Sequence, residues 1–237
     1  GSLVHLMQAG DTGSVTLSLR GAGSARTSVF LDGMRLVNPA TGVFDLSLIP
    51  GFLIQDVEVV HGSNENDPTA LGGSIHLSTG GIEQENRSIS LSGGQWGRRS
   101  VASQYETSMR RTRVRAAAQF EAYSGDYVYQ NTVLLDRPKL RRTGADKRSG
   151  SAYVHVSRPM KKGDVSLLML ASTVERGVPG LSNAAPVEAR QEDHFFRIQA
   201  KQSRSIRAGS MNWQVAANSS DLVFEHPVSG VSQLKVH

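Results

Sequence analysis

The 237 residues are enough for one or two domains, but only 38% of them are hydrophobic and 6% are aromatic, with 24 glycines. This composition does not fit a soluble helix bundle, and the longest apolar run, Leu167 to Ala171, is far too short for a membrane-spanning helix of about 20 residues. The absence of cysteine excludes disulfides, thiolate chemistry and cysteine-ligated zinc. The net charge of +5 comes without a recognised binding motif, so we expect no nucleic-acid partner.

The first part of the chain predicts short strands separated by glycine and asparagine. Val15 to Arg20 alternates in the strand period, with its apolar residues on one face, which predicts a half-buried strand. Asp32-Gly33 lies between two apolar runs, Val29 to Leu31 and Met34 to Val37. Asp-Gly in that setting is a strong signal for a β-hairpin.

Two further strands and a helical turn are expected before residue 80. The valines between Val57 and Val60 favour a strand that Gly62 ends, and Ser74 to Ser78 predicts a last short strand. Between them, Asp67-Pro68 has the form of an N-cap followed by proline at the first helical position. We therefore expect one or two helical turns within residues 64–72.

From Arg87 onward the pattern changes to long alternating segments. In Thr112 to Ala122, Val114, Ala116, Ala118, Phe120 and Ala122 share one face, and Arg113, Arg115, Gln119 and Glu121 share the other. Residues 152–156, 196–201 and 211–218 alternate in the same way, whereas residues 165–171 are nearly all apolar and select no face. The segment length matches the roughly 9 to 11 residues of a transmembrane strand.

The links between these segments alternate in length. Short links are expected at residues 109–111, 159–163 and 203–209, and long polar ones at residues 125–149 and 176–190. This order is typical of membrane barrels, which have short periplasmic turns and longer outer loops. The first link, residues 93–97, is short although strand order places it outside.

Together these features resemble the TonB-dependent outer-membrane receptors, in which a small mixed α/β plug domain sits inside a large barrel. The likeness is carried by LSLRGAGSARTSVFLDGMRL, IPGFLIQDVEVVHG and ALGGSIHLST. The matching positions are Arg20, Gly21, Asp32, Gly33, Arg35, Ile49, Pro50, Ile54, Val57, Glu58, Val59, Gly62, Gly72, Gly73 and Ile75. The resemblance implies a plug domain at residues 1–82 and antiparallel transmembrane strands of a partial outer-membrane β-barrel at residues 83–237.

The chain departs from the family in three respects. His61 stands where an arginine is usual, and NENDPTAL replaces an aromatic-glycine segment. The N-terminal part of the plug, with the segment that pairs with an energising protein, is expected to lie outside this chain. About seven strands are expected here against about 22 in barrels that hold a plug, so we expect a fragment or one piece of a split receptor. Its remaining barrel strands would come from the rest of the protein or another chain.

The resemblance implies a non-enzymatic function in the outer membrane. The chain is expected to contact outer-membrane lipid and to belong to a receptor that takes up a scarce solute, a ferric chelate or a vitamin-like ligand, energised by a TonB-type protein. One alternative is a structural, non-transporting component that has lost the coupling segment, and another is a soluble basic β-domain that binds nucleic acid. No cofactor and no metal are expected, because the seven histidines lack metal-binding spacing.

By the resemblance, ligand binding falls on the upper plug loops and the outer barrel loops, and no residue is expected to be catalytic. The candidates for ligand contact are Arg35, Asn38, Thr41, Phe44, Tyr127 and Tyr129. A second hypothesis concerns the cations expected on the inward strand faces, which are Arg113, Arg115, Arg197 and Lys201. They form either a pathway for an anionic solute or an ordinary solvated lining that contacts acidic residues of the plug.

Overall fold

The computed structural model describes residues 4–8, 13–38, 41–62, 70–80, 85–131, 136–179, 188–226 and 234–236. Residues 1–81 and residues 82–236 form two separate compact units. The division falls one residue before the domain boundary expected after residue 82. Among the described residues, no helix is long and apolar enough to cross a bilayer.

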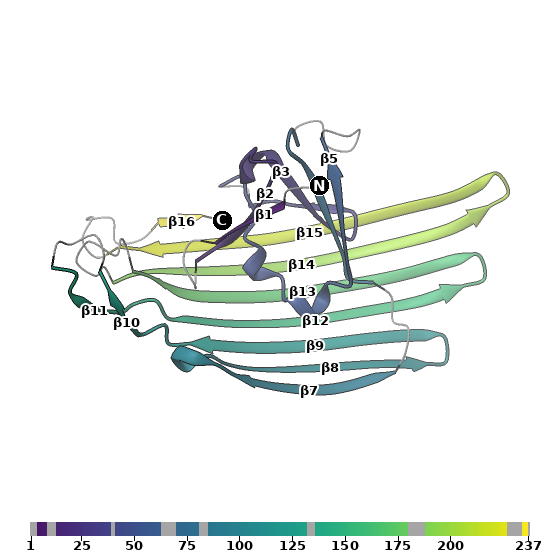
Figure 1. The fold of residues 1–237 in the computed structure, drawn as a ribbon. Coiled ribbons are helices and arrows are strands. Elements are labelled where there is room, and N and C mark those ends of the chain that lie inside the picture. The colour runs from purple at the N-terminus through teal and green to yellow at the C-terminus, as the bar shows by residue number, and fades with distance from the viewer. Residues whose placement is uncertain are drawn as a thin grey trace. The chain divides into compact units, whose positions relative to one another are not determined.

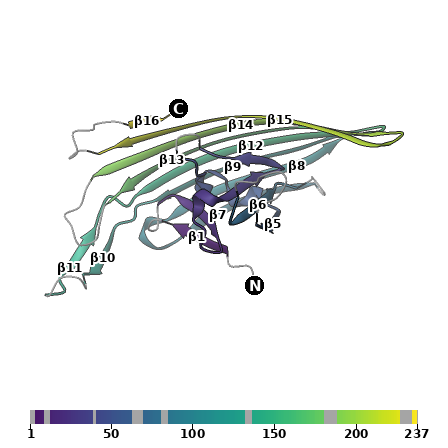
Figure 2. The same cartoon turned by 90° about the horizontal axis from the view of Figure 1, so that it is seen from above.

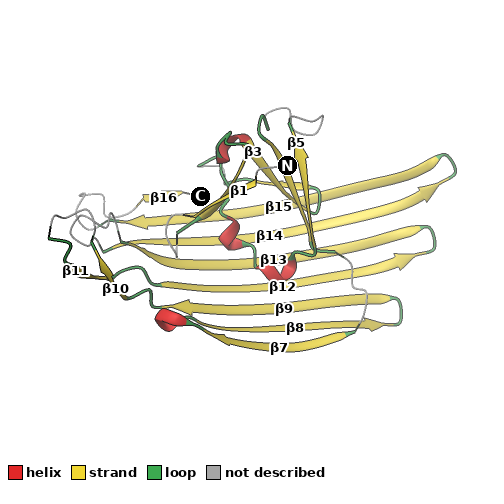
Figure 3. Ribbon diagram, in the orientation of Figure 1, coloured by secondary structure: helices red, strands yellow, loops and turns green. Residues whose placement is uncertain are grey.

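The first unit contains a four-stranded sheet and a separate hairpin (Figure 3). The sheet has the order β4 (Met34–Leu36), β3 (Thr27–Leu31), β6 (Gly73–Ser78), β5 (Asp56–His61), and β1 (Val4–Gln8) pairs with β2 (Val15–Leu19). Only β3 and β6 run parallel. Three 3₁₀ turns, η1 (Ser24–Arg26), η2 (Leu46–Leu48) and η3 (Gly51–Leu53), join the strands. The helical turn expected within residues 64–72 falls largely on residues 63–69, which lie outside the described part of the chain.

One face of this sheet contributes a row of apolar residues to the core of the first unit, and β3 is buried on both faces. Val29, Leu31 and Ile75 are buried there together with Leu36 and Leu77. They alternate with residues of the opposite face because successive side chains in a strand point to opposite sides. The strand expected from the alternation at Val15 to Arg20 is confirmed as β2.

The Asp32-Gly33 hairpin is confirmed, and it does more than reverse the chain. Both residues have positive φ, 49° and 84°, as the two-residue turns that match strand twist require. The Asp32 carboxylate also accepts hydrogen bonds from the backbone N and the Oγ1 of Thr79, both at 2.9 Å. The turn between β3 and β4 is thereby tied to the residue that follows β6.

Gly73 is required by close packing rather than by a turn. A Cβ at this position would lie 2.4 Å from the Val60 carbonyl oxygen, and the φ of Gly73 is 123°. The neighbouring Gly72 is similarly confined, since its Cβ would approach Ala22 Cβ to 2.8 Å. These glycines allow β6 to start directly against β5 and the turn after β2.

The main sheet of the second unit is antiparallel, with seven long strands and one short strand (Figure 1). Its order is β7 (Asn86–Gly93), β8 (Arg99–Met109), β9 (Thr112–Tyr123), β12 (Lys147–Met160), β13 (Gly163–Val178), β14 (Ala189–Ile206), β15 (Gly209–Glu225), β16 (Leu234–Val236). The sheet is curved (Figure 2). The antiparallel strands expected from the alternating segments are present.

The two faces of the long sheet differ as the alternation predicts. On the central strands many side chains of one face are buried and include polar residues, whereas the other face exposes large apolar side chains such as Ile89 (77% exposed) and Val215 (63%). Residues 165–171, which gave no periodic signal, also alternate: Leu168 and Leu170 are buried, and Leu167 and Met169 are exposed. Pairing of β13 with β12 and β14 fixes which of these apolar residues point to each face, and the composition of the segment alone does not show this.

The strands extend well beyond the expected 9 to 11 residues. β13, β14 and β15 have 16, 18 and 17 residues, so strand pairing continues through residues 176–178 and 189–190, which were expected to be loop. Within the long polar link expected at residues 125–149, β10 (Tyr127–Gln130) and β11 (Lys139–Arg142) form a hairpin. Backbone hydrogen bonds do not depend on apolar side chains, so polar segments beyond the apolar band still pair.

Replacing Gly73 with alanine should destabilise the β5–β6 pair. The new Cβ would overlap the Val60 carbonyl oxygen, and the backbone would keep an unfavourable φ. We expect amide hydrogen exchange in β5 and β6 to become at least about tenfold faster. Gly51→Ala is the matched control, because no atom lies within 4 Å of a Cβ at Gly51. Equal exchange in both variants would contradict the packing role.

Candidate ligand-binding surface

Strand order in the second unit places three links at the same end of the sheet. The links β7–β8, β9–β12 and β13–β14 share one end, and the tight turns at residues 110–111, 161–162 and 207–208 share the other. We call the first the link end. Because connecting segments on a rigid sheet commonly carry binding residues, the link end is the candidate site.

Trp96 is held at the link end by backbone contacts. It lies in η4 (Gln95–Gly97), with φ at 53°, and its carbonyl accepts hydrogen bonds from Ser124 Oγ at 2.7 Å and from the Gly125 N at 3.3 Å. A Cβ at Gly125 would meet the Ala145 carbonyl oxygen at 2.0 Å. The β7–β8 link and the β9–β12 link are therefore packed together closely.

Three aromatic rings gather where these links meet. The Trp96 and Tyr127 ring centroids are 5.4 Å apart, and Tyr129 follows at 6.2 Å from Tyr127 in an edge-on arrangement. Trp96 is 48% exposed. We call Trp96, Tyr127 and Tyr129 the aromatic cluster. Such a cluster offers apolar ring faces and polar ring edges to a ligand.

Arginines lie on the same segments as the aromatic cluster. Arg98 pairs with Glu121 at 2.8 Å, and Arg141 pairs with Asp126 at 3.2 Å, with both arginine side chains more than 60% exposed. In the β10–β11 hairpin, Arg142 lies directly opposite Tyr127. Arg141 lies opposite Val128, on the other face of the hairpin. The site thus combines the exposed ring of Trp96 and the half-buried rings of Tyr127 and Tyr129 with the exposed guanidinium group of Arg98, which suits a ligand with both aromatic and anionic groups.

A separate ion-pair cluster joins the end of the β9–β12 link to β13 and β14. Arg190 donates to both oxygens of Asp146, at 2.9 and 3.2 Å, and to Glu175 at 2.8 Å. The hydrogen bond from the Arg190 guanidinium lowers the pKa of Asp146 below its ordinary value. The Asp146 carbonyl also accepts from the Gly177 N at 2.9 Å, so this link is held by side chain and backbone together.

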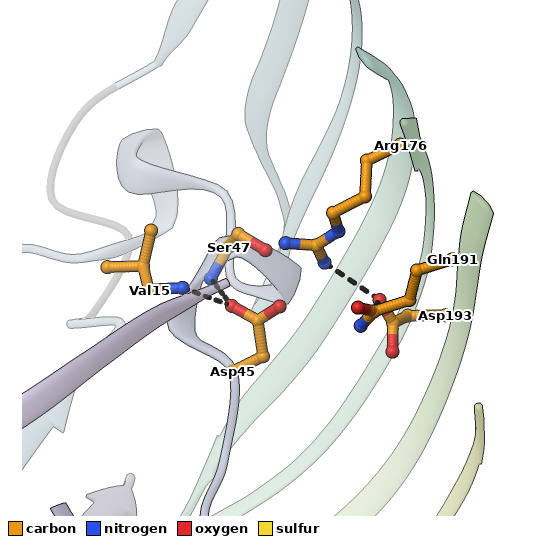
Figure 4. Close-up of polar contacts among 6 residues, drawn as sticks. All are labelled: Val15, Asp45, Ser47, Arg176, Gln191 and Asp193. Carbon is orange, nitrogen blue, oxygen red and sulfur yellow. Dashed lines mark hydrogen bonds and ion pairs between the residues drawn. The ribbon is translucent and has the colours of Figure 1, made fainter. Parts of the chain in front are cut away.

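The buried face of the second unit contains charged side chains in fixed pairs. Arg176 donates to Asp193 at 2.7 Å, and Gln191 donates to the same Asp193 oxygen at 2.9 Å (Figure 4). Arg115 pairs with Glu106 on the neighbouring strand at 2.7 Å.

Of the inward cations expected from the sequence, Arg115 and Arg197 are buried and Arg113 and Lys201 are exposed. Arg197 donates to Asn218 at 2.9 Å and to Gln199 at 3.0 Å. Arg115 and Arg197 are thus held by side chains of their own sheet.

In the first unit, the candidate ligand residues divide by exposure. Arg35 and Thr41 are exposed, whereas Asn38 and Phe44 are buried. The Asn38 side chain accepts from the Thr41 N at 3.3 Å, and its carbonyl accepts from the Gly42 N at 2.9 Å. Asn38 therefore shapes the turn that presents Thr41.

Sequence reasoning did not identify Asp45, which organises the same region. Its Oδ1 accepts from the Ser47 N and from the Val15 N, both at 2.9 Å (Figure 4). The first contact caps η2 and the second joins η2 to the start of β2. Because Val15 is 30 residues away, no local pattern reveals this contact.

The remaining plug-motif positions lie at strand ends or on an edge strand. Arg20 and Gly21 follow β2, Gly62 follows β5, and Glu58 is exposed on β5. In the second unit, sequence reasoning identified Tyr127 and Tyr129 but not Trp96. The signal that could have found Trp96 is a tryptophan in a short link between glycines and arginines, GGQWGRR.

Comparison with known proteins identifies the first unit. Residues 2–74 match the family described as TonB-dependent Receptor Plug Domain. A relative from Vibrio vulnificus (strain YJ016), named Vitamin B12 transporter BtuB, is 35% identical over 79 residues, which are 32% of this chain and 13% of the relative.

Solved structures share the fold over nearly the whole chain. The copper transporter OprC aligns with a TM-score of 0.74 at 14% identity, covering 95% of this chain and 34% of its own. The siderophore receptor PiuA from Acinetobacter baumannii aligns with a TM-score of 0.62 at 15% identity, covering 94% of this chain and 33% of its own. This chain therefore spans about a third of the length of these structures and a smaller share of the curated relative.

The Asp146–Arg190 pair should persist to acid pH. Because the folded-state pKa of Asp146 is lowered, the contribution of the pair is present above the ordinary carboxyl pKa of about 4 and is lost as the pH falls through the lowered value. Arg190→Gln should raise the pKa of Asp146, as measured by carboxyl NMR titration. Arg148→Gln, which removes a weaker nearby charge, should raise it less. An equal rise in both variants would contradict the role of the Arg190 hydrogen bond.

Proposed function

Because this chain carries the plug domain of a TonB-dependent receptor, we propose that it forms part of an outer-membrane receptor for uptake of a scarce solute. A TonB-type protein that spans the periplasm would energise uptake. The proposal is supported by the joint occurrence of a plug-domain match at residues 2–74 and a long antiparallel sheet with one apolar face. That apolar face favours a position in lipid over one in water.

The aromatic cluster and the arginines near it are the observation that supports one ligand class. The relatives are named for vitamin B12, copper and siderophores, so their names do not single out one ligand. Trp96 and Tyr127 present ring surface. Arg98, on the same link as Trp96, presents an exposed guanidinium group, and Arg142 lies opposite Tyr127 in the hairpin. A ferric chelate with aromatic groups and net negative charge matches both features.

The two sets of candidate residues have different proposed roles. Tyr127 and Tyr129, with Trp96, would contact the ligand from the outer links. Within the first unit, Arg35 and Thr41 are exposed and are the proposed residues for ligand contact, whereas buried Asn38 and Phe44 would support their loop. The proposed role is ligand binding without a chemical reaction, so it needs no catalytic residue, as expected for a transport receptor.

Trp96 provides a direct measurement of ligand binding. The chain has two tryptophans, and Trp213→Phe leaves Trp96 as the only one. Titration with a ferric tris-catecholate should quench its fluorescence, and Tyr127→Ala should weaken binding by about tenfold through loss of ring contact. Val128→Ala is the control, because Val128 lies on the other face of the same hairpin.

Three results would decide the ligand class. Quenching by the ferric catecholate that depends on Tyr127 and not on Val128 supports the proposal. Binding of cobalamin in preference to the ferric chelate would replace the ferric chelate with a vitamin-like ligand. Absence of binding by every solute tested would favour a structural, non-transporting component.

A further inference from the structure

The exposed apolar face of the second unit contains two adjoining hollows. One, of about 530 Å³, is lined by residues of β9 and β12–β15 that include Gly150, Ala152, Ala171 and Phe196. The other, of about 620 Å³, is lined by residues of β7–β9 and β12 that include Ile89, Ser103, Ala118 and Ala152. Both hollows share Ala152, so they form one groove across the strands, which we call the exterior groove.

Strand register explains the shape of the exterior groove. Four small residues, Ser103, Ala118, Ala152 and Ala171, lie side by side on adjacent strands. The row is bounded at its ends by Ile89 and Phe196, which are 77% and 46% exposed. The groove is therefore a floor of small side chains between large projecting ones.

Packing does not require a glycine at position 150, which lines the first hollow. A Cβ at Gly150 would meet its nearest atom, Thr173 Cγ2, at 3.7 Å, an ordinary contact distance. This differs from Gly73, where a Cβ would overlap backbone. At Gly150 the hollow is therefore present although a side chain would fit.

A cation lies at one end of the exterior groove. Arg87 lines the second hollow, and its guanidinium carbon lies 5.1 Å from the centre of the Tyr105 ring. Among the described residues, Arg87 has no carboxylate partner. It is the second residue of β7, so its flexible side chain can reach an interface while its stem stays on the apolar face.

The groove floor is long enough to hold part of an acyl chain. Neighbouring strands are about 4.8 Å apart, so the four small residues span about 14 Å across the strands. An acyl chain along the floor, with its phosphate at Arg87, would satisfy both the apolar groove and the cation.

We propose that the exterior groove is a binding site for one anionic membrane phospholipid, with its phosphate on Arg87 and an acyl chain over Ala118 and Ala152. The proposal rests on the proposed position of the second unit in the outer membrane. It adds a lipid site that is separate from the aromatic cluster at the link end.

Competition between two lipids with the same acyl chains tests the proposal. The full chain in maltoside micelles is incubated with equal amounts of phosphatidylglycerol and phosphatidylcholine, and bound lipids are counted by native mass spectrometry. We expect about tenfold preferential retention of phosphatidylglycerol, in the range of a charge-assisted hydrogen bond. Arg87→Gln should bring the ratio close to one, and Arg87→Lys should keep part of the preference.

Paired variants separate the groove from the rest of the same face. Ala118→Leu with Ala152→Leu fills the floor and should reduce retention of both lipids at least several-fold. Arg99→Gln removes another exposed arginine of the same face, and Ala217→Leu enlarges an exposed residue outside both hollows. Neither control should change the lipid ratio, and flotation with phosphatidylcholine vesicles reports membrane insertion independently.

The outcomes distinguish the lipid site from the membrane assignment. Equal retention of the two lipids by a chain that floats with vesicles would overturn the lipid site and leave the outer-membrane proposal in place. The same loss of preference in Arg99→Gln as in Arg87→Gln would also overturn it, since the effect would then be general charge. Failure to float with vesicles of either lipid would overturn both proposals.

Discussion

The register of the long strands is the constraint on which the second unit depends. Backbone pairing places Leu170 opposite Arg197 on one face and Met169 opposite Ile198 on the other. Because side chains alternate with a period of two, a slip of one residue would move every polar residue to the apolar face. Charged groups in lipid cost several kcal/mol or more, so the alternation leaves essentially one acceptable register.

The main effect of the buried ion pairs is to specify this register, and their net contribution to the free energy of unfolding is small. Removing Arg176 and Asp193 from water is costly, and their attraction at 2.7 Å offsets this cost without a large surplus. Their value is that a shifted strand would leave each charge without its partner. The Arg115–Glu106 pair lies directly across β8 and β9 and has the same effect on those two strands.

Sequence patterns predicted the elements that depend on local signals. The Asp32-Gly33 turn and the alternation in β9 follow from neighbouring residues, and both are present. The Asp32–Thr79 contact joins residues 47 positions apart, and Trp96 meets Ser124 across 28, so neither has a local signature. The ends of β13 and β14 were also missed, because polar residues pair there through the backbone alone.

At the link end, the groups that hold the links in place differ from the groups that a ligand would contact. Its links are held largely through main-chain groups, such as the Trp96 carbonyl and the Gly177 N, and by close approach at Gly125. The contacts that fix the course of the links involve the Trp96 carbonyl and not its ring, and the Trp96 ring contacts the Tyr127 ring. Ring identity can therefore change while the links keep their course, which allows one fold to carry different ligand preferences. Structures with the same fold and about 15% identity are consistent with such a division.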